Sequence, residues 1–341
     1  MSKKSSLPIF LALSAACAVG AAVAANKGAL NLAVRNALAK DYVLPDPGWT
    51  GRTYENIKYS DISDSCNLDI YVPESDSPMP LLILVHGGGF FFGDKHANQP
   101  KNMYNYFRRN GYACATLNYR MGGEAPFPAA IEDVKAAVRF LRSNAELYGY
   151  DPDRFAIWGE SAGGYIAAMV ALSRDDEFNG VKYIGEEEGK TASADVTALI
   201  DFYGVINMKK FREDFETAGI PKYLTDITNG KGSPDSMLDA FTQKKMAEIS
   251  DEENEKYNPE SRIDDRLKEK YFFAYIAHGN IDITVPIFQS ARFAGLLKEK
   301  IGARRVVYAE LENLRHGESR YFTDKTLTPV RAFLDRIFGI T

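Results

Sequence analysis

Cysteine and histidine are both scarce in this chain, which has three cysteines and four histidines among its 341 residues. These residues are scattered without the spacing of metal ligands, so we expect no metal site. Cys66 and Cys114 stand in apolar, strand-like segments, where a free thiol usually behaves as a small buried hydrophobic group. A framework of disulfide bonds is therefore not expected.

Positive charge is not in excess either, because 41 Lys and Arg residues stand against 46 Asp and Glu residues, a net charge of −5. Such a chain offers no basic field to hold the phosphates of a nucleic acid. The glycine-rich segment 87–93 also lacks the Gly-Lys-Ser/Thr ending of a phosphate-binding loop. We therefore expect no nucleic-acid partner.

One long apolar run is present, close to the N-terminus. Lys3 and Lys4 precede a segment rich in Ala and Leu, residues 7–25, which ends before the polar pair Asn26-Lys27. This pattern is typical of a signal peptide covering residues 1–25, and it predicts an exported protein. Because the run is nearly long enough to span a bilayer, an uncleaved membrane anchor is the alternative.

The rest of the chain is divided into a short leader and one large domain. Residues 26–50 carry apolar side chains at helical spacing and are expected to form a docking helix or linker. Residues 51–341 are long enough for a single large core. Within them, Leu81–Val85 and Ala113–Leu117 are continuous apolar runs, which predict strands covered on both faces.

Strand-like and helix-like segments alternate through this domain. The other expected strands are Tyr54–Tyr59, Cys66–Val72, Phe155–Trp158, Ala198–Phe202, Tyr271–Ala277 and Val306–Leu311, and the expected helices are Ala129–Tyr148, Ala162–Leu172, Phe288–Lys300 and Leu327–Phe338. The alternation predicts an α/β fold with a doubly wound, mostly parallel sheet of about eight strands. In such sheets ligands bind at the carboxyl ends of the strands.

Residues from about 205 to 265 interrupt the alternation with a mixed, charge-rich segment. An amphipathic helix is expected near Met237–Ile249. Long inserts in compact folds tend to be functional, so this one is interpreted as a cap over the site or, equally, as a surface excursion without contact to it.

Ser161 stands between Gly159 and Gly163 after a strand-like segment. Glycines at this spacing allow a strand to turn sharply into a helix and leave the serine hydroxyl exposed. Upstream, the glycines after His86 free the backbone to supply N–H donors to the oxyanion that forms when a serine attacks a carbonyl, and Ala162 N–H is a further donor. The pair of motifs predicts acyl transfer from Ser161.

A serine hydroxyl needs a base, and the base needs an acidic partner. His316 follows a strand and precedes the last helix, and it is the preferred base. Asp282 follows another strand end, and the order Ser161, Asp282, His316 is that of the α/β-hydrolases. The other acids weighed were Asp264, Asp265, Glu310 and Glu312.

The remaining polar and aromatic residues near these motifs receive supporting roles. His86 is expected to orient the glycine loop, and His278 to pack as a loop-positioning residue. Phe90 and Phe91 are expected to have mixed roles, in the core and against the substrate. Glu160 is a candidate for substrate contact, for local hydrogen bonding or for tuning His316.

Six motifs mark the stretch from about Tyr54 to the C-terminus: His86-Gly-Gly-Gly-Phe90, Asn118-Tyr-Arg120, Pro126-Phe-Pro-Ala-Ala-Ile-Glu-Asp-Val134, Tyr150-Asp-Pro-Asp-Arg154, Gly159-Glu-Ser-Ala-Gly-Gly164 and His278-Gly-Asn-Ile-Asp-Ile-Thr-Val-Pro286. In these motifs the chain resembles the α/β-hydrolase serine esterases, in the acetyl-esterase/lipase and feruloyl-esterase-like branch related to hormone-sensitive lipase. The resemblance implies a Ser161–His316–Asp282 triad, an oxyanion hole formed by the N–H groups of Gly87, Gly88 and Ala162, and no cofactor.

The function expected on this resemblance is that of a serine carboxylesterase. It would hydrolyse small or polysaccharide-linked esters of acetyl or feruloyl type through an acyl-enzyme. The alternatives are a serine peptidase or an arylformamidase on the same fold, and a non-catalytic hydrolase-like binding protein. The sequence leaves the acyl and alcohol specificity and the oligomeric state open.

Overall fold

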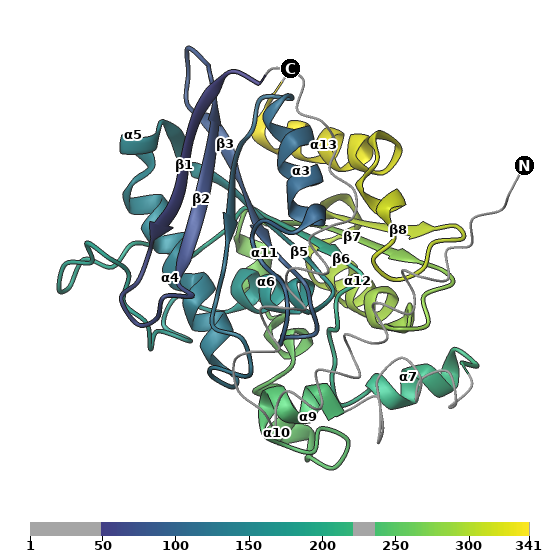
Figure 1. Ribbon diagram of the computed structural model, residues 1–341. Helices are drawn as coiled ribbons and strands as arrows, with labels where there is room; N and C mark the ends of the chain where they lie inside the picture. Colours follow the sequence, from purple (N-terminus) through teal and green to yellow (C-terminus); the bar gives the residue numbers. More distant parts are fainter. Residues whose placement is uncertain (1–48, 221–235, 341) are drawn as a thin grey trace, which may run out of the picture.

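The computed structural model describes residues 49–220 and 236–340. Their core is an eight-stranded sheet with the order β1-β2-β4-β3-β5-β6-β7-β8 (Figure 1). The strands are β1 (Gly51–Lys58), β2 (Asn67–Pro73), β3 (Met79–Val85), β4 (Ala113–Leu117), β5 (Tyr150–Glu160), β6 (Ala198–Phe202), β7 (Phe273–Gly279) and β8 (Val306–Leu311). In this sheet β2 pairs antiparallel with β1 and β4, and the pairs from β4 to β8 are parallel. The predicted α/β fold is confirmed.

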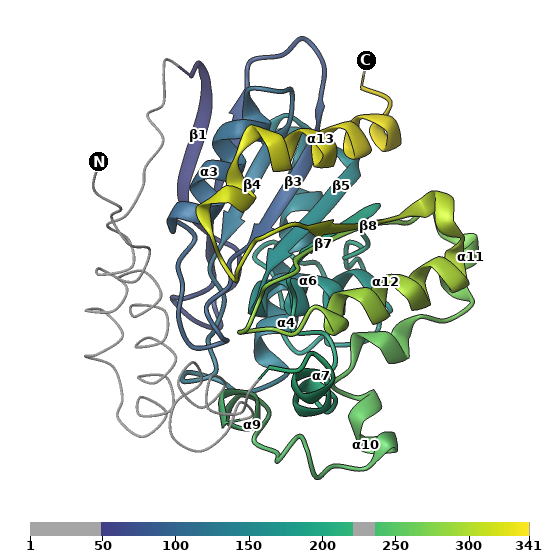
Figure 2. The ribbon, with the colours of Figure 1, turned by 90° about the vertical axis from the view of Figure 1, so that its right-hand side faces the viewer.

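Helices cover both faces of the sheet (Figure 2). They are α3 (Asn98–Arg108), α4 (Ala129–Ser143), α5 (Ala145–Tyr148), α6 (Ala162–Leu172), α7 (Phe211–Thr217), α9 (Ser236–Thr242), α10 (Asp251–Glu255), α11 (Arg266–Glu269), α12 (Phe288–Ile301) and α13 (Asp324–Phe338). Apolar side chains of α4, α6 and α12 share one core cluster, and those of α3 and α13 share the other.

Strand β3 shows how the sequence builds these two cores. All seven of its residues are buried. Leu81 and Ile83 belong to the cluster under α4 and α6, whereas Leu82 and Leu84 belong to the cluster under α3 and α13. Successive side chains of a strand point to opposite faces, so an unbroken apolar run suits a strand that is covered on both sides.

Several elements differ from the expected ones, among them β5, which is longer, and α7, α10 and α11, which were not expected. The helix expected over Ala129–Tyr148 is divided at Asn144 into α4 and α5. The helix expected near Met237–Ile249 ends at Thr242, because Gln243 has a φ of 56° and so leaves the helical conformation. Beyond it, the backbone N–H of Met246 donates to Asp239 Oδ1. Helix α3 was not expected, because its segment is mostly polar; its apolar residues Met103, Tyr104 and Phe107 are buried in the core. The expectations for residues 1–48 lie outside the described residues.

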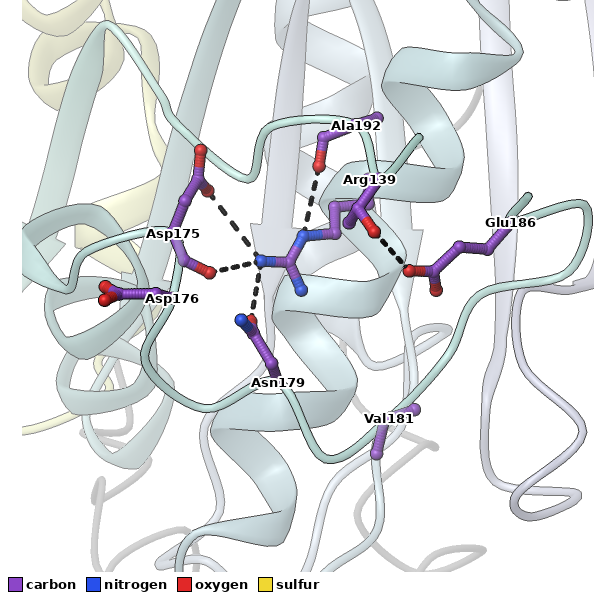
Figure 3. Close-up of a pocket in the computed structure, with 8 residues that line it drawn as sticks. Arg139, Asp175, Asp176, Asn179, Val181, Glu186 and Ala192 are labelled. Carbon is purple, nitrogen blue, oxygen red and sulfur yellow. Dashed lines mark hydrogen bonds and ion pairs between the residues drawn. The ribbon is translucent and has the colours of Figure 1, made fainter. Parts of the chain in front are cut away.

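Helix α4 holds the loop 173–197, which joins α6 to β6. Arg139 donates from Nε to Ala192 O (3.1 Å) and from Nη2 to Asp175 O and Asn179 Oδ1, each at 2.7 Å. These groups line a hollow of about 300 Å³, into which the guanidinium extends (Figure 3). Because the loop leads into the start of β6, the hollow lies at the amino edge of the parallel strands.

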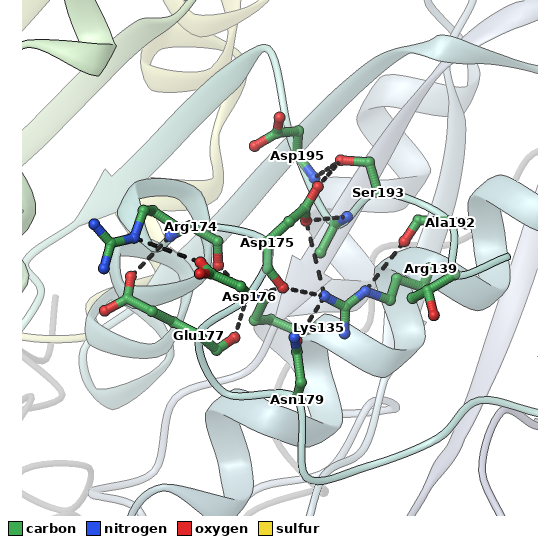
Figure 4. A network of polar contacts seen from close by, with 12 residues as sticks. Lys135, Arg139, Arg174, Asp175, Asp176, Glu177, Asn179, Ala192, Ser193 and Asp195 are labelled. Atoms are coloured by element: carbon green, nitrogen blue, oxygen red, sulfur yellow. Dashed lines mark hydrogen bonds and ion pairs between the residues drawn. The ribbon is translucent and has the colours of Figure 1, made fainter. Parts of the chain in front are cut away.

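One turn before Arg139, the buried Lys135 supports the same loop (Figure 4). Its Nζ donates to the backbone carbonyls of Arg174 (2.6 Å) and Glu177. Burial lowers the pKa of Lys135 to about 8, but the amine keeps N–H donors for these carbonyls in either protonation state.

We expect Lys135→Met to lower the free energy of unfolding by about 1–3 kcal/mol, because it leaves buried carbonyls without donors. The measurement is chemical denaturation of both proteins. Lys190→Met is the matched control, since Lys190 is exposed in the same loop and contacts only Glu187 among the described ion pairs. Equal midpoints for the two variants would contradict the role given to Lys135.

Candidate active site

Ser161 lies at the turn between β5 and α6, in a conformation that L-residues rarely adopt. Its φ is 52° and its ψ is −122°. The turn is possible because Gly159 and Gly163, two residues to either side of Ser161, have no Cβ. A Cβ on Gly159 would come 2.0 Å from Gly163 O, and one on Gly163 would come 2.3 Å from Val85 O. The turn leaves Ser161 partly exposed, whereas its neighbour Ala162 is buried.

His316 and Asp282 meet Ser161 at the carboxyl edge of the sheet. Ser161 Oγ lies 2.9 Å from His316 Nε2, and His316 Nδ1 lies 2.7 Å from Asp282 Oδ2. A carboxylate only accepts hydrogen bonds, so the proton of a neutral His316 is assigned to Nδ1, and Nε2 is free to accept from the Ser161 hydroxyl. The three residues come from loops after β5, β7 and β8, as the sequence analysis expected.

Asp282 is held in place by its own loop and by two histidines. Its Oδ1 accepts the backbone N–H groups of Thr284 (2.8 Å) and Val285 (3.0 Å). Burial alone would raise the pKa of this carboxyl group, but the imidazoles of His316 and His278 outweigh burial and hold the pKa well below its usual range. Asp282 is therefore an ionised partner for His316.

His278 is fully buried behind Asp282. Its Nδ1 lies 2.7 Å from Ser290 Oγ, and its Nε2 lies 3.0 Å from Val285 O and 3.3 Å from Asp282 Oδ2. The ring thus joins the end of β7 to the loop that carries Asp282, an arrangement that suits a loop-positioning residue.

The glycine loop after β3 turns with positive φ at Gly88 (120°) and Gly89 (58°). The backbone N–H of Gly87 lies close enough to the carboxyl group of Glu160 to lower the pKa of that group. The expectation that Gly87, Gly88 and Ala162 supply the oxyanion donors stays a prediction. Ala162 is the first residue of α6, where a backbone N–H has no partner within the helix.

Phe90 and Phe91 point into the protein, with only 1% and 4% of their surface exposed. Phe90 stacks on Phe241 of α9, with ring centroids 4.1 Å apart. The expectation that one of these rings contacts the substrate stays a prediction.

The insert supplies part of the wall beside the glycine loop. Its α9 carries Phe241 and also Met237, whose Cε would lie 2.3 Å from a Cβ placed on Gly89. Figure 2 shows α7, α9 and α10 grouped at one end of the molecule. The contact at Gly89 favours a cap-like insert over an excursion remote from the site.

Sequence reasoning did not identify Tyr203, which follows β6 with a φ of 44°. Its hydroxyl donates to Glu160 Oε2 at 2.7 Å, and its ring meets that of His316 edge-on, with centroids 4.8 Å apart. The only local signal was its position directly after a strand that leads to the same edge of the sheet.

Within residues 49–220 and 236–340, we find no cluster of His, Cys, Asp or Glu side chains arranged to hold a metal ion. The same part of the chain contains no helix with the length and apolar character needed to cross a membrane. Cys66 and Cys114 are free and buried.

The BD-FAE family model matches residues 68–297 of this chain. Among curated proteins of Mycobacterium tuberculosis (strain ATCC 25618 / H37Rv), esterase LipQ is 31% identical over 76% of this chain and 56% of its own length. The probable carboxylic ester hydrolase LipM is 28% identical over 76% of this chain and 55% of its own. The chain thus spans about half the length of these relatives.

Solved structures give the same fold. A bifunctional GH43-CE protein of Bacteroides eggerthii superposes with a TM-score of 0.66 at 26% identity, over 84% of this chain and 35% of that chain. A truncated carbohydrate esterase from gut microbiota superposes with a TM-score of 0.63 at 24% identity, over 84% of this chain and 96% of that chain.

Proposed function

This chain belongs to the BD-FAE family, and from that premise we propose that it is a serine carboxylesterase with Ser161 as nucleophile, His316 as base and Asp282 as orienting acid. The single observation that carries the proposal is the relay from Ser161 Oγ through both nitrogens of His316 to Asp282. An exposed serine hydroxyl with such a base and acid is the arrangement of acyl-transfer enzymes.

The reaction proceeds in two steps. Ser161 attacks the ester carbonyl while His316 takes its proton, and the N–H groups of Gly87, Gly88 and Ala162 stabilise the charge on the carbonyl oxygen. His316 then protonates the leaving alcohol. Water, deprotonated by the same histidine, hydrolyses the acyl-enzyme and restores Ser161.

We propose small or carbohydrate-linked esters of acetyl or feruloyl type as substrates. The support is the motif resemblance described above and the similarity in fold to a carbohydrate esterase. The test is hydrolysis of p-nitrophenyl acetate, butyrate and octanoate and of methyl ferulate by the purified protein. Turnover of none of these esters by folded protein would reject the esterase proposal.

Export is part of the same proposal and rests on residues 1–25. We expect the mature protein to begin near residue 26, because the apolar run ends there in small residues. Determining the N-terminal residue of protein recovered from outside the cytoplasm checks this, and an intact N-terminus on membrane-bound protein would indicate an anchor instead.

We expect Gly163→Ala to lower kcat/KM for p-nitrophenyl acetate by about tenfold or more, since small displacements of reacting groups can cost up to about 10². The added Cβ would lie 2.3 Å from Val85 O and 2.6 Å from His86 O, and these backbone atoms cannot move aside without shifting the turn or the glycine loop. Gly295→Ala is the matched control, because a Cβ there meets nothing within 4 Å. Similar activity for both variants would contradict the tight packing of the turn.

A further inference from the structure

We propose that Glu160 is a positioning residue, whose carboxyl group ties the nucleophile turn to the glycine loop and, through Tyr203, to the face of His316. This inference rests on the proposed esterase function. It differs from the expected substrate contact of Glu160 in that the role is carried out inside the protein, where the side chain is buried and accepts a hydrogen bond from Tyr203.

Glu160 is the last residue of β5 and immediately precedes Ser161. On one side its carboxyl group lies near the backbone N–H of Gly87, the residue that begins the glycine loop, and this N–H lowers the pKa of Glu160. The two backbones also touch, since a Cβ on Gly87 would lie 2.7 Å from Glu160 O and 3.3 Å from Ser161 Cβ. The position of the candidate oxyanion donors relative to Ser161 therefore depends on this contact.

On its other side, Glu160 fixes Tyr203. The phenol donates to Glu160 Oε2 at 2.7 Å, while the backbone N–H of Tyr203 donates to Ala277 O on β7 at 2.8 Å. With both ends held, the ring of Tyr203 stands edge-on to His316, and the ring of Tyr321 packs against it at 4.5 Å. One carboxyl group thus connects the glycine loop, the nucleophile and the base.

The ionised form of Glu160 is the form that can face both Tyr203 and the N–H of Gly87 without giving up an acceptor. Burial raises the pKa of Glu160 to about 7, although the contacts with Tyr203 and with the backbone N–H of Gly87 lower it. The titratable groups that face Glu160 are Tyr203 and Tyr119. His86 stacks on Tyr119, and His316 lies beyond Tyr203. The positioning should therefore weaken as the pH falls through neutrality.

The experiment compares kcat and KM of the full-length protein with those of Glu160→Gln, Tyr203→Phe and the double variant, on p-nitrophenyl acetate. We expect each single variant to lower kcat roughly 10- to 100-fold with little change in KM, because the loss is one of transition-state geometry. The double variant should lose no more than the worse single variant, because both remove the same connection. In the pH profile of kcat, the loss of activity of the wild type at low pH should reflect two protonations. The loss for Glu160→Gln should reflect one.

Matched controls come from a second buried tyrosine that donates to a carboxylate. Tyr112 Oη lies 2.7 Å from Asp335 Oδ1, the same distance as in the pair at the site. This bond joins the residue just before β4 to α13. Tyr112→Phe and Asp335→Asn should leave kcat and the pH profile unchanged, whatever they do to stability. They separate a loss of packing from a loss of positioning.

A folded Glu160→Gln variant with the kcat and pH profile of an active wild type would overturn the inference and leave the esterase proposal standing. Losses of kcat that the two controls share would overturn it as well. An inert wild type would overturn both proposals, because the positioning role exists only for that reaction.

Discussion

Replacing Ser161 with alanine is expected to lower kcat/KM for p-nitrophenyl acetate by roughly 10⁶, the order of the loss in kcat when the nucleophile of a serine hydrolase is removed. The oxygen removed is the atom that His316 Nε2 approaches at 2.9 Å, and no acyl-enzyme can form without it. The donors of Gly87, Gly88 and Ala162 remain, so a small residual rate above that of water should persist.

The change should not disturb the fold, because the alanine keeps the Cβ and the hydroxyl is partly exposed. Ser173→Ala is the matched control: Ser173 is a buried serine that directly follows the other end of α6. It should keep full activity. If folded Ser161→Ala protein hydrolyses the ester as fast as wild type, Ser161 is not the nucleophile.

Asp282→Asn is expected to lower kcat by about 10⁴, as exchange of the acid for an amide does in serine proteases. The amide keeps an oxygen for the N–H groups of Thr284 and Val285, so the loop should hold its shape. Its NH₂ group would then face His316 Nδ1, which favours the tautomer with the proton on Nε2. That tautomer cannot accept the proton of Ser161.

The control for Asp282→Asn is Asp264→Asn, another acid that the sequence left as an alternative. In the structure Asp264 pairs with Arg266 at 2.8 Å, where both side chains are substantially exposed. Its loss should leave kcat unchanged, since exposed pairs contribute little. Full activity of Asp282→Asn, or inactivity of Asp264→Asn, would show that the acid has been assigned to the wrong residue.

The sequence by itself determined most of the framework. The bounds of β4, β6, β8 and α6 agree with the expected ranges, because apolar runs and helical periodicity are local properties of the chain. The turn at Ser161 is also local, since the glycines on either side remove the clashes it would cause. Asp282 and His316 were chosen by a simple rule, that the carboxyl ends of parallel strands share one edge of the sheet, and the structure brings both side chains to Ser161.

Only the tertiary structure decided how the parts of the site are joined. The contacts of Glu160 with Gly87 and with Tyr203 depend on the register of three strands, in which Val85 pairs with Gly159 and Glu160 with Phe202. If either pair of strands were shifted by one residue, these side chains would point to the other face of the sheet. The local sequence does not determine this register. The contact of α9 with Gly89 likewise joins residues that are distant in the chain. Local patterns fix which elements form, whereas packing between distant elements fixes which polar groups meet.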